Sequence, residues 1–142
     1  IVLIDGPDLA EQISKATDNA SIRLALDPVG GDTYARLAES LGYGGTLVAY
    51  GFLSGKPPML NTGQLIFNDT RLRGFWLYKW YQTATMQEKQ EAFGQIIPLI
   101  VNGTLKANID SRYTVDQIEQ AVTRAWEGGR NGKVLIVPNP IE

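Results

Sequence analysis

Two apolar stretches of this sequence end in glycine and aromatic residues, a combination that can hold a flat, ring-shaped ligand. Both are typical of short strands, the first over Gly45–Phe52 and the second over Arg71–Trp76. Ligands of parallel α/β sheets bind at the carboxyl ends of the strands. The candidate binding residues at these two ends are Tyr50, Gly51, Phe52, Leu53, Phe75, Trp76 and Leu77. Plain turns flanked by core aromatics remain the alternative at both ends.

The turn after an earlier apolar run adds a third candidate, made of Asp27, Val29 and Gly30. Glycines between a strand and a helix let a ligand approach the backbone closely, although a tight turn without a ligand needs them equally. Asp27 could accept hydrogen bonds from a ligand or cap the turn. Lys133 follows Gly132 and could meet a phosphate or a carboxylate, with a solvated lysine at a strand edge as the alternative.

The composition removes most catalytic chemistry from this chain. Cysteine and histidine are both absent, which excludes disulfides, thiolate and imidazole catalysis and the usual zinc ligands. No serine stands in a nucleophile elbow, no Walker lysine is present, and no tyrosine has a lysine four residues later. The glycines of Gly42–Gly45 fail the dinucleotide pattern, because Leu47 stands where its third glycine belongs. We therefore expect no catalytic residue and no metal site in this chain.

Length and composition are those of an ordinary globular chain. The sequence has 142 residues, the size of one domain, of which 44% are hydrophobic and 20% charged. The net charge of −2 argues against a general nucleic-acid binder. No segment approaches the roughly 18 consecutive apolar residues of a membrane span, so we expect no membrane partner. The chain begins at Ile1 without a leader-like segment, and we interpret it as a fragment or a processed piece.

Strands and helices alternate along the chain, which predicts an α/β fold with a mostly parallel sheet and helices on both faces. The expected strands cover residues 1–4, 22–26, 46–50, 70–75, 106–112 and 134–137. The expected helices start at Asp8, at Asp32 or Thr33, at Thr85 and at Thr114, with a short helical turn over 64–67. Glu11, Glu88 and Gln117 complete capping boxes at three of these starts. We expect Gly42 to end a helix in the left-handed conformation and Pro98 to kink or break one.

Three stretches of the sequence resemble the C-terminal part of the zinc-free medium-chain dehydrogenases/reductases. They include Asp27-Pro28-Val29-Gly30-Gly31, Gly44-Gly45-Thr46-Leu47 and Gly74-Phe75-Trp76-Leu77. The likeness is to the branch that holds quinone oxidoreductases and mitochondrial-type trans-2-enoyl thioester reductases. The ending Gly132-Lys133-Val134-Leu135-Ile136 is similar to the end of the same family, so the resemblance covers nearly the whole chain.

The resemblance implies an incomplete Rossmann-like sheet in residues 1–101, the C-terminal part of a dinucleotide-binding domain. Residues 102–142 would be a returning segment of the catalytic domain, whose catalytic tyrosine lies outside this chain. The implied cofactor is NADPH, with NADH as the alternative. Tyr50–Leu53 and Phe75–Leu77 would border its nicotinamide, the turn from Asp27 to Gly30 would line the crevice, and Lys133 would lie near the cofactor. The implied substrate is a small molecule with a conjugated carbonyl, either a quinone or a 2-enoyl thioester.

The family's usual strand order, 3-2-1-4-5-6, implies that two central strands are missing here. We therefore expect weak NADPH binding, or none, by this chain alone and an open apolar edge on the strand over 22–26. Because the last strand of this sheet often pairs with its two-fold mate in the family, we expect a homodimer through the edge over 70–75. The alternative function is a non-catalytic nucleotide-binding or interaction domain. We expect a cytoplasmic location, with a mitochondrial one as the alternative.

Overall fold

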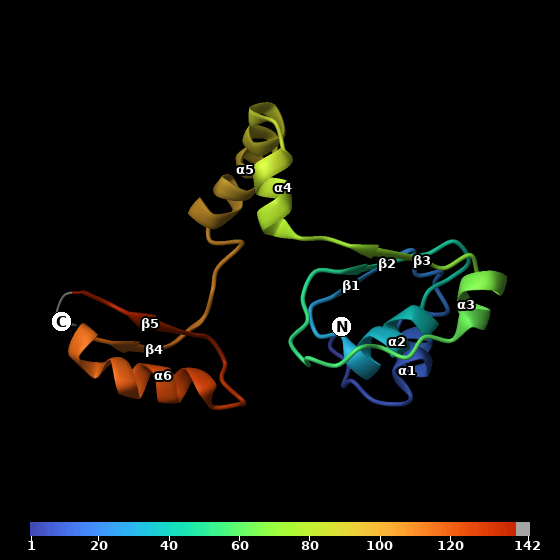
Figure 1. Cartoon of the computed structure of the whole chain (residues 1–142), viewed down its shortest axis with the longest axis horizontal. Coiled ribbons are helices and arrows are strands. Elements are labelled where there is room, and N and C mark those ends of the chain that lie inside the picture. The colour runs from blue at the N-terminus through green and yellow to red at the C-terminus, as the bar shows by residue number, and fades with distance from the viewer. Residues whose placement is uncertain (139–142) are drawn as a thin grey trace. The chain divides into compact units, whose positions relative to one another are not determined.

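The structure, a computed structural model, describes residues 1–138, and the chain forms two compact units. Unit 1 covers Ile1–Ala84, and unit 2 begins at Thr85. Each unit contains its own small parallel sheet with a helix packed against it (Figure 1).

Three parallel strands form the sheet of unit 1. In spatial order they are β1 (Leu24–Asp27), β2 (Thr46–Ala49) and β3 (Arg71–Gly74). The helices between and before them are α1 (Leu9–Ala16), α2 (Gly31–Glu39) and α3 (Thr62–Phe67). Helix α2 packs against β1 and β2, and α1 packs against α2 on the same side of the sheet (Figure 1). Parallel strands joined by helical crossovers confirm the predicted α/β class.

The core of unit 1 lies between the sheet and α2. Leu47, on the central strand, has no exposed surface. The buried residues that pack with it are Ala25, Tyr34, Ala38 and Leu41. On β1, Leu24 and Leu26 point the other way, and each is 57% exposed. Because side chains alternate along a strand, one face of this sheet is covered by α2 while the other presents leucine side chains to solvent.

The expected strand over residues 1–4 is wrong. The structure places no strand there, and Ile1 and Val2 are 91% and 97% exposed. An apolar run becomes a strand only where a neighbouring strand pairs with it, and this run has none in unit 1. The other strands of unit 1 lie within two residues of their predicted limits.

Two expected helix ends in unit 1 are also wrong. Asp8 precedes α1 without capping it, because its carboxylate accepts a hydrogen bond from the Gln12 side chain at 3.0 Å instead. Gly42 does not adopt the left-handed conformation, which falls on Gly44 with a φ of +68°. Gly42 is needed for a different reason, because a Cβ there would collide with the Ser21 hydroxyl.

Unit 2 contains a long helix followed by a strand–helix–strand motif. Its elements are α5 (Met86–Val101), β4 (Ile109–Tyr113), the 3₁₀ turn η1 (Val115–Gln117), α6 (Ile118–Trp126) and β5 (Lys133–Ile136). Strands β4 and β5 pair in parallel, and α6 packs against both. The capping boxes predicted at Thr85 and Thr114 are both present.

Pro98 lies inside α5 and does not break it, so of the two predicted outcomes the break is wrong and the kink remains a prediction. Proline lacks the amide that would bond to the carbonyl four residues earlier, so one hydrogen bond of the helix is lost, but only three helical residues follow Pro98. Its own carbonyl oxygen still accepts a hydrogen bond from the Asn102 amide at 3.0 Å. The helix therefore continues to Val101.

The boundary between the two units lies between Ala84 and Thr85 in the sequence. Helix α5 therefore falls in unit 2. The domain boundary predicted from the sequence lies after residue 101. The assignment of 102–142 to a catalytic domain remains a prediction.

Candidate functional site

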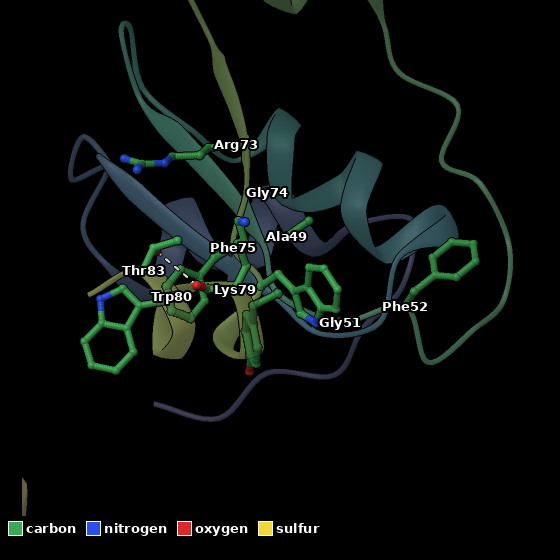
Figure 2. A pocket seen from close by; sticks show the side chains of 11 residues that line it. Ala49, Gly51, Phe52, Arg73, Gly74, Phe75, Lys79, Trp80 and Thr83 are labelled. Carbon is green, nitrogen blue, oxygen red and sulfur yellow. Dashed lines mark hydrogen bonds between the residues drawn. The ribbon is translucent and has the colours of Figure 1, made fainter. Parts of the chain in front are cut away.

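A pocket with a volume of about 640 Å³ lies at the carboxyl ends of β2 and β3. Its walls come from the ends of these strands and from α4 (Leu77–Thr83), as Figure 2 shows. Five of the residues predicted at the two strand ends line it, namely Tyr50, Gly51, Phe52, Phe75 and Trp76. The structure thus brings together two segments that are far apart in the sequence.

The register of the sheet explains why the segments that follow β2 and β3 lie close together. Ala49 is paired with Gly74, and the Phe75 amide donates a hydrogen bond to the Ala49 carbonyl oxygen at 2.8 Å. Both segments leave the sheet directly after this pair. Tyr50 and Phe75 therefore start from neighbouring points at the same edge of the sheet, as expected for parallel strands.

Helix α4 supplies lining residues that are not among the site residues predicted from the sequence. Lys79, Trp80 and Thr83 reach the pocket from this helix (Figure 2). The helix starts after Trp76, whose side chain makes no capping hydrogen bond, so the usual start signal is absent. The one available signal is the spacing of Trp76, Trp80 and Thr83 by four and three residues, which fits one face of a helix.

The aromatic side chains of the pocket are largely open to solvent. Trp76 is 67% exposed, Phe52 is 59% exposed and Phe75 is 43% exposed. The rings of Trp76 and Tyr78 lie with their centroids 5.3 Å apart and their planes tilted by 41°. A cluster of exposed aromatic rings is typical of a surface that another molecule covers.

Positive charge accompanies these rings. Arg73 on β3 and Lys79 on α4 line the pocket, and no Asp or Glu lines it. The ion pairs formed within residues 1–138 include neither of these two cations. The pocket therefore suits a ligand that combines a planar ring with an anionic group.

The turn after β1 lies beside the pocket and outside its lining. Asp27 is fully buried, and its two carboxylate oxygens accept hydrogen bonds from the amides of Val29 at 3.0 Å and Gly30 at 2.7 Å. This geometry is the turn cap, one of the two roles that the sequence left open. Direct contacts of Val29 and Gly30 with a cofactor remain a prediction.

The remaining candidates also lie outside the pocket lining. Leu53 is 81% exposed in the loop after β2, and Leu77 is the first residue of α4. Lys133 is the first residue of β5, in unit 2. Their assignment to a cofactor remains a prediction.

The residues that the structure describes offer neither a cluster of metal ligands nor a membrane-spanning helix. Residues 1–138 contain no group of three or more metal-ligating side chains that could hold an ion. Over the same range, no helix combines the length and the apolar character needed to cross a bilayer.

Comparison with known proteins identifies the family. The sequence model of the zinc-binding dehydrogenases matches residues 4–136, which is nearly the whole chain. The chain therefore belongs to this family, and the predicted resemblance to the C-terminal part of the medium-chain dehydrogenases/reductases is confirmed.

Its curated relatives include mitochondrial enoyl-acyl-carrier-protein reductases. The one from Dictyostelium discoideum is 36% identical over 120 residues, which are 84% of this chain and 34% of the relative. The one from Homo sapiens is 35% identical over 114 residues, which are 80% of this chain and 31% of the relative. The chain thus spans about a third of the length of these proteins.

Solved structures agree with this family. A protein from Bacillus thuringiensis assigned as an NADPH:quinone reductase has a TM-score of 0.74 and 26% identity, over 89% of this chain and 38% of that one. A mycobacterial quinone oxidoreductase has a TM-score of 0.77 at 21% identity, over 96% of this chain and 41% of that one. The second likeness concerns the fold alone.

Proposed function

We propose that this chain is part of an oxidoreductase that uses NADPH to reduce a conjugated carbonyl, in a quinone or in a 2-enoyl thioester. The observation that carries the proposal is the pocket at the ends of β2 and β3, which joins aromatic rings to two cations. Such a pocket lies where parallel α/β sheets bind their ligands. The enoyl reductase and NADPH:quinone reductase relatives support the reaction class.

The residues present fit a dinucleotide at this pocket. Trp76 and Phe75 offer flat apolar surfaces for a nicotinamide ring, and Gly51 and Gly74 add no side chain to fill the space. A Cβ on Gly74 would meet nothing within 4 Å, so this part of the pocket is open to a ring. Arg73 and Lys79 would attract the negative charge of a phosphate. When bound, the cofactor supplies the hydride, and this chain binds and orients its ring.

We expect NADPH to bind this chain weakly, with a dissociation constant above about 10 µM, because only one wall of the site is present. Trp76→Ala is expected to weaken that binding several-fold, since it removes the largest flat surface. The control is Trp126→Ala, because Trp126 is 86% exposed and lies in unit 2. NMR titration of the 142-residue chain measures both effects.

Two results would contradict this expectation. A dissociation constant below about 10 µM would show that the chain alone holds a complete site. No saturable change at millimolar NADPH would favour the alternative, a non-catalytic interaction domain of the same fold. NADH titrated in parallel decides the cofactor preference.

The reaction itself is tested on the longest natural protein that contains this chain. NADPH oxidation is followed at its nicotinamide absorbance with a 2-enoyl thioester and with a quinone as separate substrates. Turnover of either supports the proposal, and the preferred one names the substrate class. No oxidation with either substrate would refute it.

We further propose that residues 102–142 are a returning segment of the catalytic domain and that the chain forms a homodimer through the edge of β3. The compartment remains a prediction, cytoplasmic or mitochondrial. The enoyl reductases from Dictyostelium discoideum and Homo sapiens are mitochondrial by name. Imaging of the tagged natural protein decides between the two compartments.

A further inference from the structure

Two loops at the carboxyl edge of the unit 1 sheet are joined by backbone hydrogen bonds. One loop, residues 28–31, follows β1, and the other, residues 50–56, follows β2. The bonds run from Tyr50 to Asp27 (2.9 Å), Leu53 to Pro28 (3.1 Å), Ser54 to Val29 (2.9 Å) and Gly31 to Lys56 (3.0 Å), each from amide to carbonyl oxygen. We call this pair of loops the clasp.

The clasp is tight enough to require glycine. A Cβ on Gly51 would collide with the carbonyl oxygen of Pro28. A Cβ on Gly30 would lie 3.1 Å from the Phe52 ring, and Gly30 has a φ of +77° that side chains rarely adopt. Because the loops touch through their backbones, a shift of one loop must move the other.

Asp27 sets the shape of the first loop. It is one of the largest fully buried side chains in the described chain, and both of its oxygens accept loop amides. Burial, with a further contribution from the Asp27 charge, raises the pKa of Tyr34 on α2, so this neighbour stays neutral at physiological pH. No ion pair within residues 1–138 includes Asp27. The loop amides are therefore the partners that hold this carboxylate.

We infer that Asp27 is a positioning residue for the proposed cofactor site. Its carboxylate fixes the loop of residues 28–31, and through the clasp this loop holds Tyr50, Gly51 and Phe52 at the pocket. Asp27 itself is absent from the pocket lining and is fully buried. The sequence suggested that Asp27 contacts the cofactor, whereas this inference gives it an indirect role. The role in cofactor binding rests on the proposed function.

The test replaces Asp27 with asparagine. Asp27→Asn keeps the size of the side chain but turns one accepting oxygen into a donor that faces a loop amide. Hydrogen exchange at the Leu53 and Ser54 amides is expected to become about tenfold faster or more, since a hydrogen bond to a charged group is lost. Amides of the central strand β2 are expected to keep their protection. Asp18→Asn, the same change at an exposed position, is the control and is expected to alter neither.

The pattern of exchange separates a positioning role from a merely structural one. Faster exchange confined to Val29 and Gly30 would overturn the inference, because the clasp would not transmit the change. An equal effect throughout unit 1 would overturn it too, since Asp27 would then act on global stability.

NADPH titration of the same variants provides the second readout. Asp27→Asn is expected to raise the dissociation constant several-fold, while Asp18→Asn leaves it unchanged. An unchanged constant alongside faster exchange at Leu53 and Ser54 would overturn the role in binding. If the unsubstituted chain shows no response to NADPH, the titration is made on the longest natural protein that contains it, where no response would refute the proposed function. Dependence of the Leu53 and Ser54 amides on Asp27 would still support the positioning of the pocket wall.

A variant on the opposite loop covers the case in which Asp27→Asn does not fold. Gly51→Ala puts a methyl group against Pro28 without touching Asp27. The Gly31 amide, which bonds to Lys56, is expected to exchange faster. The control is Gly128→Ala, since a Cβ on Gly128 would meet nothing within 4 Å. Unchanged exchange at Gly31 would overturn the clasp as a mechanical link.

Discussion

At the scale of single residues, Thr70 is an expected weak point of unit 1. It is 7% exposed, and its hydroxyl oxygen has no hydrogen-bond partner among the described residues. A buried hydroxyl without a partner costs roughly 1–3 kcal/mol. Thr70→Val keeps the shape and removes the hydroxyl, so it is expected to raise the free energy of unfolding by about 1 kcal/mol.

Urea denaturation followed by circular dichroism measures this change. Thr70→Ser is the control, because it keeps the hydroxyl and loses a buried methyl group, and it is expected to lower stability. Equal stability of the valine variant and the unsubstituted chain would mean that the hydroxyl has a partner in solution.

Residues at the pocket were predictable where a strand end carries them. Tyr50, Gly51 and Phe75 could be found because their neighbours form an apolar run that stops at a glycine or an aromatic ring. Lys79 and Thr83 could not, because they lie on a helix without a capping signal. The role of Asp27 was open, since a carboxylate at a turn can serve a ligand or the backbone, and its burial and its hydrogen bonds with the Val29 and Gly30 amides favour the backbone.

At the scale of elements, the cap at the start of α5 depends on the ionisation of the Glu88 carboxyl group. The Glu88 carboxylate accepts hydrogen bonds from the Thr85 amide at 2.7 Å and from the Thr85 hydroxyl at 2.9 Å. These bonds lower the pKa of Glu88 below its ordinary value of 4.5. A carboxylate with a lowered pKa stabilises the folded state above its ordinary pKa. The contribution of this cap is therefore present above pH 4.5 and is lost as the pH falls through the lowered value.

Substitution of Thr85 tests this cap. Thr85→Ala removes the hydroxyl but keeps the amide, so the pKa of Glu88 is expected to move part of the way back toward 4.5. NMR titration of the Glu88 side chain measures the shift, with Thr83→Ala as a control that should leave it unchanged. A Glu88 that titrates identically in both variants would show that the hydroxyl plays no part.

Elements were predictable where local signals decide them. The capping boxes at Thr85 and Thr114 marked two helix starts correctly. The strand predicted from the apolar run over residues 1–4 is wrong, because a strand forms only beside a neighbouring strand and the local sequence does not show whether one is present. Pro98 did not end its helix, because the helix tolerates the loss of one hydrogen bond three residues before its end.

At the scale of the whole molecule, the unit 1 sheet has two open edges, because within residues 1–138 β1 and β3 each pair with β2 alone. Open edges promote association with other chains. The amides of Arg71 and Phe75 bond to β2, so alternation directs the Gly74 amide outward. We expect the chain to self-associate through β3, and Gly74→Pro to weaken this association by removing the outward donor.

Sedimentation velocity over a range of concentrations measures the association. The matched variant on the other edge is Leu26→Lys, which places a charge on β1 and is expected to have the smaller effect. A monomer at every concentration would contradict the expectation. Loss of association in Leu26→Lys alone would move the interface to β1.

The strand order of unit 1 also bears on how quickly the pocket wall can form. Each strand pairs with the next one along the chain, β1 with β2 and β2 with β3. Each pairing closes one helical crossover and not a longer stretch, although parallel pairing still forms more slowly than the contacts within a helix. The sheet and its pocket edge therefore need only the single stretch between Leu24 and Trp80, so they can assemble before the residues of unit 2 have been synthesised.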